Sequence, residues 1–92
     1  MFTWSVITPE GNAATGECEF LVAPTTGGEL GVLAEHAPLI ASVVPGDLRV
    51  ASGATVRTVR LGAGVIEVRD NRVRLLVTHA VEGGISDSPA PA

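Results

Sequence analysis

The sequence predicts an all-β fold of eight to ten short strands, arranged as a compact antiparallel sandwich or barrel. Three observations lead to this prediction. Apolar residues recur at every second position in the clearest stretches, which is the period of a strand with one buried face. Short runs of Gly, Pro, Asn and Asp separate these stretches. No stretch of the chain has the 3.6-residue period of an amphipathic helix.

The alternating stretches define the strands in order along the chain. Each has apolar residues that share one face, with polar or charged residues between them. These apolar sets are Phe2, Trp4 and Val6; Cys18, Phe20 and Val22; Leu48 and Val50; Ile66 and Val68; and Val73, Leu75 and Val77. The breaks between strands are predicted at Pro9–Asn12, Pro24–Gly28, Pro45–Asp47, Ser52–Gly53 and Gly62–Gly64.

Two further stretches are predicted on other grounds. Residues 55–61 alternate less regularly, but their Val and Thr content favours a strand. Asp70 and Asn71 stand alone between two alternating stretches. Because Asp and Asn tolerate positive φ, this pair predicts a two-residue hairpin loop.

The length of 92 residues fits one small domain, which we place at residues 1–81. Only Phe2, Trp4 and Phe20 are aromatic, so the core is predicted to consist of aliphatic side chains. Residues 82–92 are rich in Gly, Ser, Pro and Ala, and we expect them to form a flexible tail.

Composition also narrows the function classes. Cys18 is the only cysteine, which excludes an internal disulfide and favours a reducing compartment. The N-terminus has no features of a signal peptide, and no apolar run is long enough to span a membrane. The net charge is −4, which argues against non-specific nucleic-acid binding.

The chain offers little material for catalysis. Cys18 is predicted on an apolar strand face, where burial raises a thiol pKa and makes it inert. His36 and His79 lie far apart in sequence, and no third ligand of suitable spacing accompanies them. The glycine turns do not lead into a phosphate-binding Lys-Ser/Thr sequence or a helix. We therefore predict no catalytic, cofactor-binding or metal-binding residues, with a small enzyme using His36 or His79 as a weaker alternative.

Residues 27–39, GGELGVLAEHAPL, form the most unusual stretch of the chain. A glycine turn is followed by Glu29, and Glu35 and His36 come after an apolar strand. This arrangement is compatible with an acid–histidine pair, two metal ligands, a docking tip or solvated loop residues. The absence of a nucleophile and of a third ligand favours the last two.

Several short motifs follow one another along the chain. The most specific are Gly-Glu-Leu-Gly-Val at residues 28–32 and His-Ala-Pro-Leu at residues 36–39. With them, in this order, the following stretches resemble the epsilon subunit of bacterial F-type ATP synthase over roughly residues 2–85: Ile7–Gly11, Phe20–Pro24, Pro45–Arg49, Gly62–Val68 and Asn71–Val73.

The resemblance implies a flattened antiparallel β-sandwich of about ten strands. It implies a non-catalytic rotor subunit of the central stalk, which couples ion flow through the ring of c subunits to ATP synthesis. The implied partners are the gamma subunit and the c-ring, with no nucleic acid and no cofactor. Such a subunit is peripheral on the cytoplasmic face of the bacterial plasma membrane and touches the membrane only through the ring.

The resemblance also assigns residues to two interfaces. The c-ring interface would consist of Gly28, Glu29, Leu30, Gly31 and His36. The gamma-subunit interface would consist of Pro38, Leu39 and Ala41.

The chain departs from the family pattern in two places. Family members often have Pro-Gly before the histidine, where this chain has Ala34 and Glu35. They usually continue into a pair of C-terminal helices, to which ATP binding and the braking of hydrolysis are attributed, whereas this sequence ends at Ala92. The resemblance therefore assigns neither function to residues 1–92. The alternative function is an unrelated β-sandwich module that binds a peptide or a carbohydrate.

Overall fold

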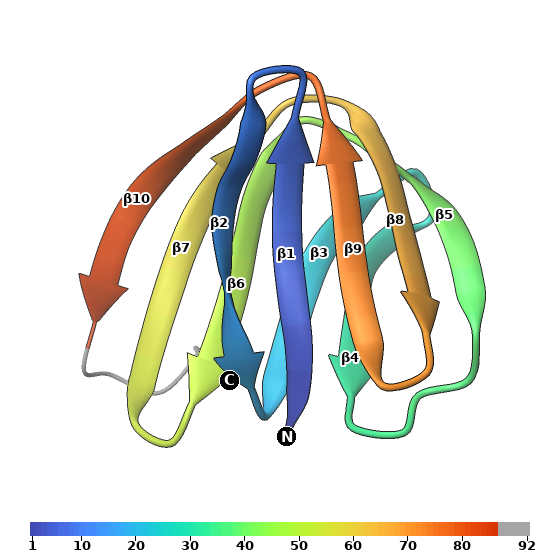
Figure 1. The fold of residues 1–92 in the computed structure, drawn as a ribbon, viewed down its shortest axis with the longest axis vertical. Helices are drawn as coiled ribbons and strands as arrows, with labels where there is room; N and C mark the ends of the chain where they lie inside the picture. Colours follow the sequence, from blue (N-terminus) through green and yellow to red (C-terminus); the bar gives the residue numbers. More distant parts are fainter. Residues whose placement is uncertain (87–92) are drawn as a thin grey trace.

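The computed structural model describes residues 1–86, which form ten strands and no helix (Figure 1). The alternation of apolar and polar residues accounts for most of these strands. Their bounds are β1 Phe2–Thr8, β2 Gly11–Cys18, β3 Phe20–Thr25, β4 Gly28–Leu33, β5 Leu39–Val43, β6 Gly46–Ser52, β7 Thr55–Leu61, β8 Gly64–Arg69, β9 Arg72–Val77 and β10 Ala80–Ser86.

The strands form two layers, which confirms the predicted all-β sandwich. The first sheet has the order β2-β1-β9-β8-β5, and the second has the order β4-β3-β6-β7-β10. The two sheets are joined at one corner, where Thr25 of β3 pairs with Val43 of β5. Figure 1 shows the first sheet in front of the second.

One strand pair is parallel, where the sequence predicts antiparallel pairs throughout. β1 runs parallel to β9, with Trp4 opposite Val73 and Val6 opposite Leu75. The other pairs among the described strands are antiparallel. The alternation of apolar residues determines which face of a strand is buried. It does not determine the direction of a neighbouring strand from a distant part of the chain, so the parallel pairing of β1 with β9 could not be predicted from it.

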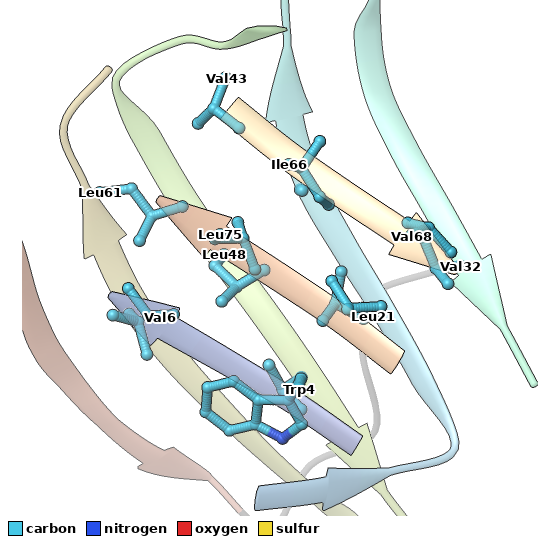
Figure 2. Packing of buried hydrophobic residues seen from close by; sticks show 14 of the residues in the cluster. Trp4, Val6, Leu21, Val32, Val43, Leu48, Leu61, Ile66, Val68 and Leu75 are labelled. Atoms are coloured by element: carbon cyan, nitrogen blue, oxygen red, sulfur yellow. The ribbon is translucent and has the colours of Figure 1, made fainter. Parts of the chain in front are cut away.

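The core lies between the two sheets (Figure 2). Trp4 and Val6 of β1 and Leu75 of β9 face Leu21 of β3 and Leu48 of β6 across it. These side chains are almost fully buried, and the rest of the cluster is mainly Val, Leu and Ile. The predicted aliphatic core and the predicted inward faces of β1, β6, β8 and β9 are therefore confirmed.

The predicted face for Cys18, Phe20 and Val22 is wrong. Cys18 is buried, but Leu21 and Ala23 are the buried residues of β3, and Phe20 and Val22 are half-buried on the outer face. The cause is a break at Glu19 between β2 and β3. Its N–H donates to the carbonyl oxygen of Ala51 at 2.9 Å. Its carboxylate accepts from the N–H of Gly53 at 2.6 Å. After Glu19 the buried positions therefore change from even-numbered residues, such as Cys18, to odd-numbered ones, Leu21 and Ala23.

The hairpin predicted at Asp70 and Asn71 is confirmed. Both residues have positive φ, 51° and 59°, as a type I′ turn requires. The turn joins β8 to β9, with Arg69 paired to Arg72.

The last strand, β10, extends past the domain boundary expected at residue 81. Its pairing with β7 shifts register between Glu82 and Gly84. A bulge at a glycine pair interrupts the alternation by which strands are recognised in a sequence. Residues 87–92 of the expected tail lie outside the described residues.

Candidate docking surface

The first part of the 27–39 stretch is a tight hairpin between β3 and β4. Thr26 and Gly27 form the turn, and Gly28 has a φ of +109°, which favours glycine. The Thr25 hydroxyl donates to the carbonyl oxygen of Gly28 at 2.6 Å. Among the described strands β4 pairs only with β3. β4 is therefore an edge strand of the second sheet, with one side unpaired over residues 1–86. We call residues 26–29, at the turn of this hairpin, the tip.

Glu29 is the only charged residue of β4, and it is already paired within the molecule. Its Oε2 accepts from Nη2 of Arg49 on β6 at 2.9 Å. The Glu29 side chain is 69% exposed, whereas that of Arg49 is 30% exposed. The carboxylate is thus presented outward and held from the protein side by a guanidinium.

The next three residues of the motif have structural roles. Leu30 is half-buried and packs against the core. A Cβ added at Gly31 would lie 3.3 Å from the ring of Phe20, so the ring occupies the space of a side chain there. Val32 is buried, so of the five motif residues only Glu29 directs a side chain toward solvent.

The far end of β4 is organised differently. Leu33 is 61% exposed, and the turn that follows places Glu35 at φ 63°. The N–H of Glu35 donates to Oδ1 of Asn71 at 2.9 Å, and Nδ2 of Asn71 donates to the carbonyl oxygen of Met1 at 3.1 Å. Positive φ is the conformation that glycine adopts most easily, so the glycine that the family resemblance leads one to expect at this position would fit the observed backbone. We call residues 33–38 the far end.

His36 lies at the far end and Glu29 at the tip, so the structure does not bring them together. β4 is an extended strand of six residues, so its first and last Cα atoms lie about 16 Å apart. Nδ1 of His36 lies 2.7 Å from the carbonyl oxygen of Ala37. An acid–histidine pair or a shared metal ion is incompatible with this placement.

The residues predicted at the gamma-facing surface alternate in exposure. Pro38 is exposed, whereas Leu39 and Ala41 are half-buried and pack against the core. Ile40, between them on β5, is 73% exposed, which the sequence analysis missed. The signal was available, because neighbouring residues of a strand point to opposite faces.

The remaining candidates for catalysis are dispersed. Cys18 is fully buried, and burial raises the pKa of its thiol to about 11. Nδ1 of His79 lies 3.2 Å from the hydroxyl of Thr78, in the connection between β9 and β10. Figure 1 shows the strands of the two-layered fold that these candidates come from. Over residues 1–86 no cluster of three His, Cys, Asp or Glu side chains forms a metal site. In the same range no helix is long and apolar enough to cross a membrane.

The three aromatic residues do not form a binding platform. Phe2 and Trp4 are buried in the core, and Phe20 lies against Gly31. Sugar-binding and many peptide-binding surfaces depend on exposed aromatic rings. Of the features that the sequence pointed to, the tip with its ion pair and the apolar residues around β5 remain as candidates for a docking surface.

Sequence comparison finds close relatives. Residues 1–83 match the family model for the ATP synthase delta/epsilon chain, β-sandwich domain. The ATP synthase epsilon chain of Desulfitobacterium hafniense is 42% identical over 82 residues, which cover 89% of this chain and 62% of that protein. The epsilon chain of Pelotomaculum thermopropionicum is 46% identical over 76 residues, 82% of this chain and 56% of that protein. The chain thus spans about three fifths of the length of these relatives.

Solved structures share the fold. A chain of the Euglena gracilis mitochondrial ATP synthase, in a structure of OSCP, F1 and c-ring, superposes with a TM-score of 0.79 at 24% identity. That match covers 86% of this chain and 51% of the other. A chain of the Tetrahymena thermophila central stalk and c-ring superposes with a TM-score of 0.70 at 18% identity, covering 86% and 64%. At these identities the matches establish the β-sandwich fold.

Proposed function

This chain belongs to the delta/epsilon chain family of ATP synthase, and from that premise we propose that it is a non-catalytic subunit of the central stalk. In this role it would turn with the rotor and couple ion flow through the c-ring to ATP synthesis. The observation that carries the proposal is the family match, which extends over residues 1–83 and so includes almost the whole described sandwich.

The physical properties of the domain support a mechanical role. A rotor element must transmit torque between two partners without deforming. Two sheets that share one continuous aliphatic core and are joined by backbone pairing at a corner form a stiff body. The dispersal of Cys18, His36 and His79 supports a subunit without an active site of its own.

We assign the c-ring contact to the β4 edge, with Gly28, Glu29, Leu30, Gly31 and His36. Since Glu29 and His36 are at opposite ends of β4, both residues contact the ring only if its loops run along the whole strand. Gly28 would allow close backbone approach, because a Cβ there would meet nothing within 4 Å, and Glu29 would supply the charge.

We assign the gamma contact to the neighbouring surface of Pro38, Leu39 and Ala41. Ile40 is added to this surface because its side chain is 73% exposed. A shallow depression beside it is lined by Pro38, Leu39, Ile40, Glu67, Val68, Arg69 and Asp70. In this assignment the subunit is peripheral on the cytoplasmic face and reaches the membrane only through the ring.

Site-directed crosslinking tests the proposal. In a Cys18→Ala background, Glu29→Cys and Pro38→Cys variants are labelled with a short maleimide–diazirine reagent, mixed with a gamma–c-ring subcomplex and irradiated, so that the diazirine inserts into the neighbouring subunit. We expect Glu29→Cys to crosslink to a c subunit and Pro38→Cys to the gamma subunit. Glu17→Cys, an exposed position of β2 outside both surfaces, is the matched control.

Two outcomes would contradict the proposal. Failure of the unmodified chain to associate with the subcomplex at micromolar concentration would remove the central-stalk role. Association with equal crosslinking from Glu17→Cys and Glu29→Cys would keep the role and reject the assignment of the two surfaces.

A further inference from the structure

Arg49 is a largely buried arginine on β6 with a side-chain N–H group that is unpaired within residues 1–86. Its side chain is 30% exposed, and its Nε is buried without a hydrogen-bond partner. An unpaired buried N–H of a charged group is costly, so some compensating interaction is expected. Within the described residues, that interaction is the 2.9 Å contact between its Nη2 and Oε2 of Glu29.

The strand register shows how far Arg49 reaches. Gly31, Val22 and Arg49 lie in one row across β4, β3 and β6. Glu29 is on β4, paired with Pro24 of β3. The Arg49 side chain therefore extends over β3 to contact a strand that is not its neighbour. Of the five ion pairs in the described structure, this is the one that involves the edge strand β4.

The contact leaves half of the carboxylate unused. Arg49 binds Oε2, and no side chain of the described residues donates to Oε1. A carboxylate has about four acceptor sites, so the outward oxygen remains able to accept from a further cation. Because the Glu29 side chain is held before a partner arrives, less side-chain entropy is lost on docking.

We propose that Arg49 is the positioning residue for Glu29, and that the tip presents a pre-oriented ion pair whose free oxygen receives a cationic side chain of the partner. This inference rests on the proposed function, in which the partner at the tip is the c-ring. The partner group is thus a Lys or Arg on a polar loop of the ring. The recognition element is a carboxylate held between two cations.

Three variants test the coupling: Glu29→Gln, Arg49→Gln and the double substitution. Affinity for the gamma–c-ring subcomplex is measured, with thermal unfolding recorded for each variant so that all comparisons use folded protein. Each single substitution is expected to weaken binding by up to about fivefold, the usual range for an exposed ion pair. The double variant is expected to bind no more weakly than Glu29→Gln alone, because Arg49 acts through Glu29.

Exchanging the charges of Glu29 and Arg49 distinguishes a role of the ion pair in orienting the partner-facing carboxylate from a role in stabilising the fold. Glu29→Arg combined with Arg49→Glu keeps an ion pair across β3 and is expected to unfold near the wild-type temperature. It presents a guanidinium to the partner, so binding should fall below that of Glu29→Gln. Arg49→Lys keeps the charge and is expected to recover part of the affinity lost in Arg49→Gln.

The control is Arg60→Gln, which removes a comparable exposed pair with Asp47 outside both assigned surfaces and should leave binding unchanged. Additive losses, or wild-type binding by the charge-exchanged variant, would overturn the positioning role while the central-stalk function stands. A Glu29→Gln variant with unchanged affinity would instead remove Glu29 from the proposed ring contact, and the inference with it.

Discussion

The tip and the far end of β4 are held by different kinds of interaction. At the tip, Thr25 pairs with Val43, and Val43 pairs with Gly64 of β8. This backbone ladder connects the tip hairpin to both sheets. At the far end, the loop after Leu33 is held by the side chain of Asn71. The tip is thus held by main-chain pairing that is continuous with both sheets, whereas the loop at the far end is held by the side chain of Asn71.

The difference has a consequence for the proposed role. A contact that transmits torque is best placed where the backbone itself is continuous with both sheets, because main-chain pairing resists displacement. The far end can vary in sequence at smaller cost, and the unusual Glu35 lies there. Four predictions test this comparison, in order of decreasing expected effect.

Gly64→Ala is expected to disrupt the corner near the tip, where Gly64 of β8 pairs with Val43 of β5. An added Cβ would lie 2.7 Å from Cα of Val77 and would overlap the carbonyl oxygen of Leu76. Backbone atoms there have no room to move, so we expect a loss of about 3 kcal/mol in the free energy of unfolding, measured in urea. Gly27→Ala, whose Cβ would meet nothing closer than 3.9 Å, is the control. Equal stability of the two variants would show that the corner is not a rigid joint.

The thiol of Cys18 is a probe of the core near the far end. Cys18 pairs with Phe2, and Phe20, two residues later, pairs with Leu33 at the end of β4. Burial raises its pKa from 9.0 to about 11, so the folded state keeps the proton that the unfolded state loses. Stability is therefore full below pH 9 and falls as pH rises to 11, by about 2–3 kcal/mol at about 1.4 kcal/mol per pH unit.

The measurement is chemical denaturation at intervals between pH 8 and 11. The chain has no lysine and no tyrosine, and arginine stays protonated, so few other groups titrate in this window. A Cys18→Ala variant should lack the decline. If it shows the same decline, the thiol is not its source.

Asn71→Ala is expected to release the far end. It removes the hydrogen bonds to Glu35 and Met1 and places alanine at φ 59°. We expect a loss of about 2 kcal/mol in thermal or urea unfolding. Asn71→Gly loses the same hydrogen bonds without the backbone strain, so it should be less damaging. If both variants are as stable as the wild type, Asn71 does not hold the loop.

Glu35→Gly is expected to stabilise the chain slightly. Glycine adopts the observed φ of 63° without steric cost, so a gain of about 0.5–1 kcal/mol is predicted. Ala34→Gly, in the same turn but without positive φ, should give no gain. Differential scanning calorimetry compares the two, and a lower melting temperature for Glu35→Gly than for the wild type would refute the strain argument.

Much of the fold was predictable because its signals are local. The inward residues of β1, β6 and β9 follow from alternation, and the Asp70–Asn71 turn follows from the φ preferences of two residues. The burial and raised pKa of Cys18 were also expected. The site was less predictable: Leu39 and Ala41 were chosen for the gamma surface, although alternation placed Ile40 outward.

The sequence by itself determined the regularly alternating strands, the inward side chains of β1, β6, β8 and β9, and the family to which the chain belongs. Tertiary structure alone decided the outward face of β3, the parallel pairing of β1 with β9, the separation of Glu29 from His36 and the contact of Arg49 with Glu29. The reason is physical. Strand period and turn conformation depend on neighbouring residues, whereas these four features depend on how distant strands pair when the sandwich closes.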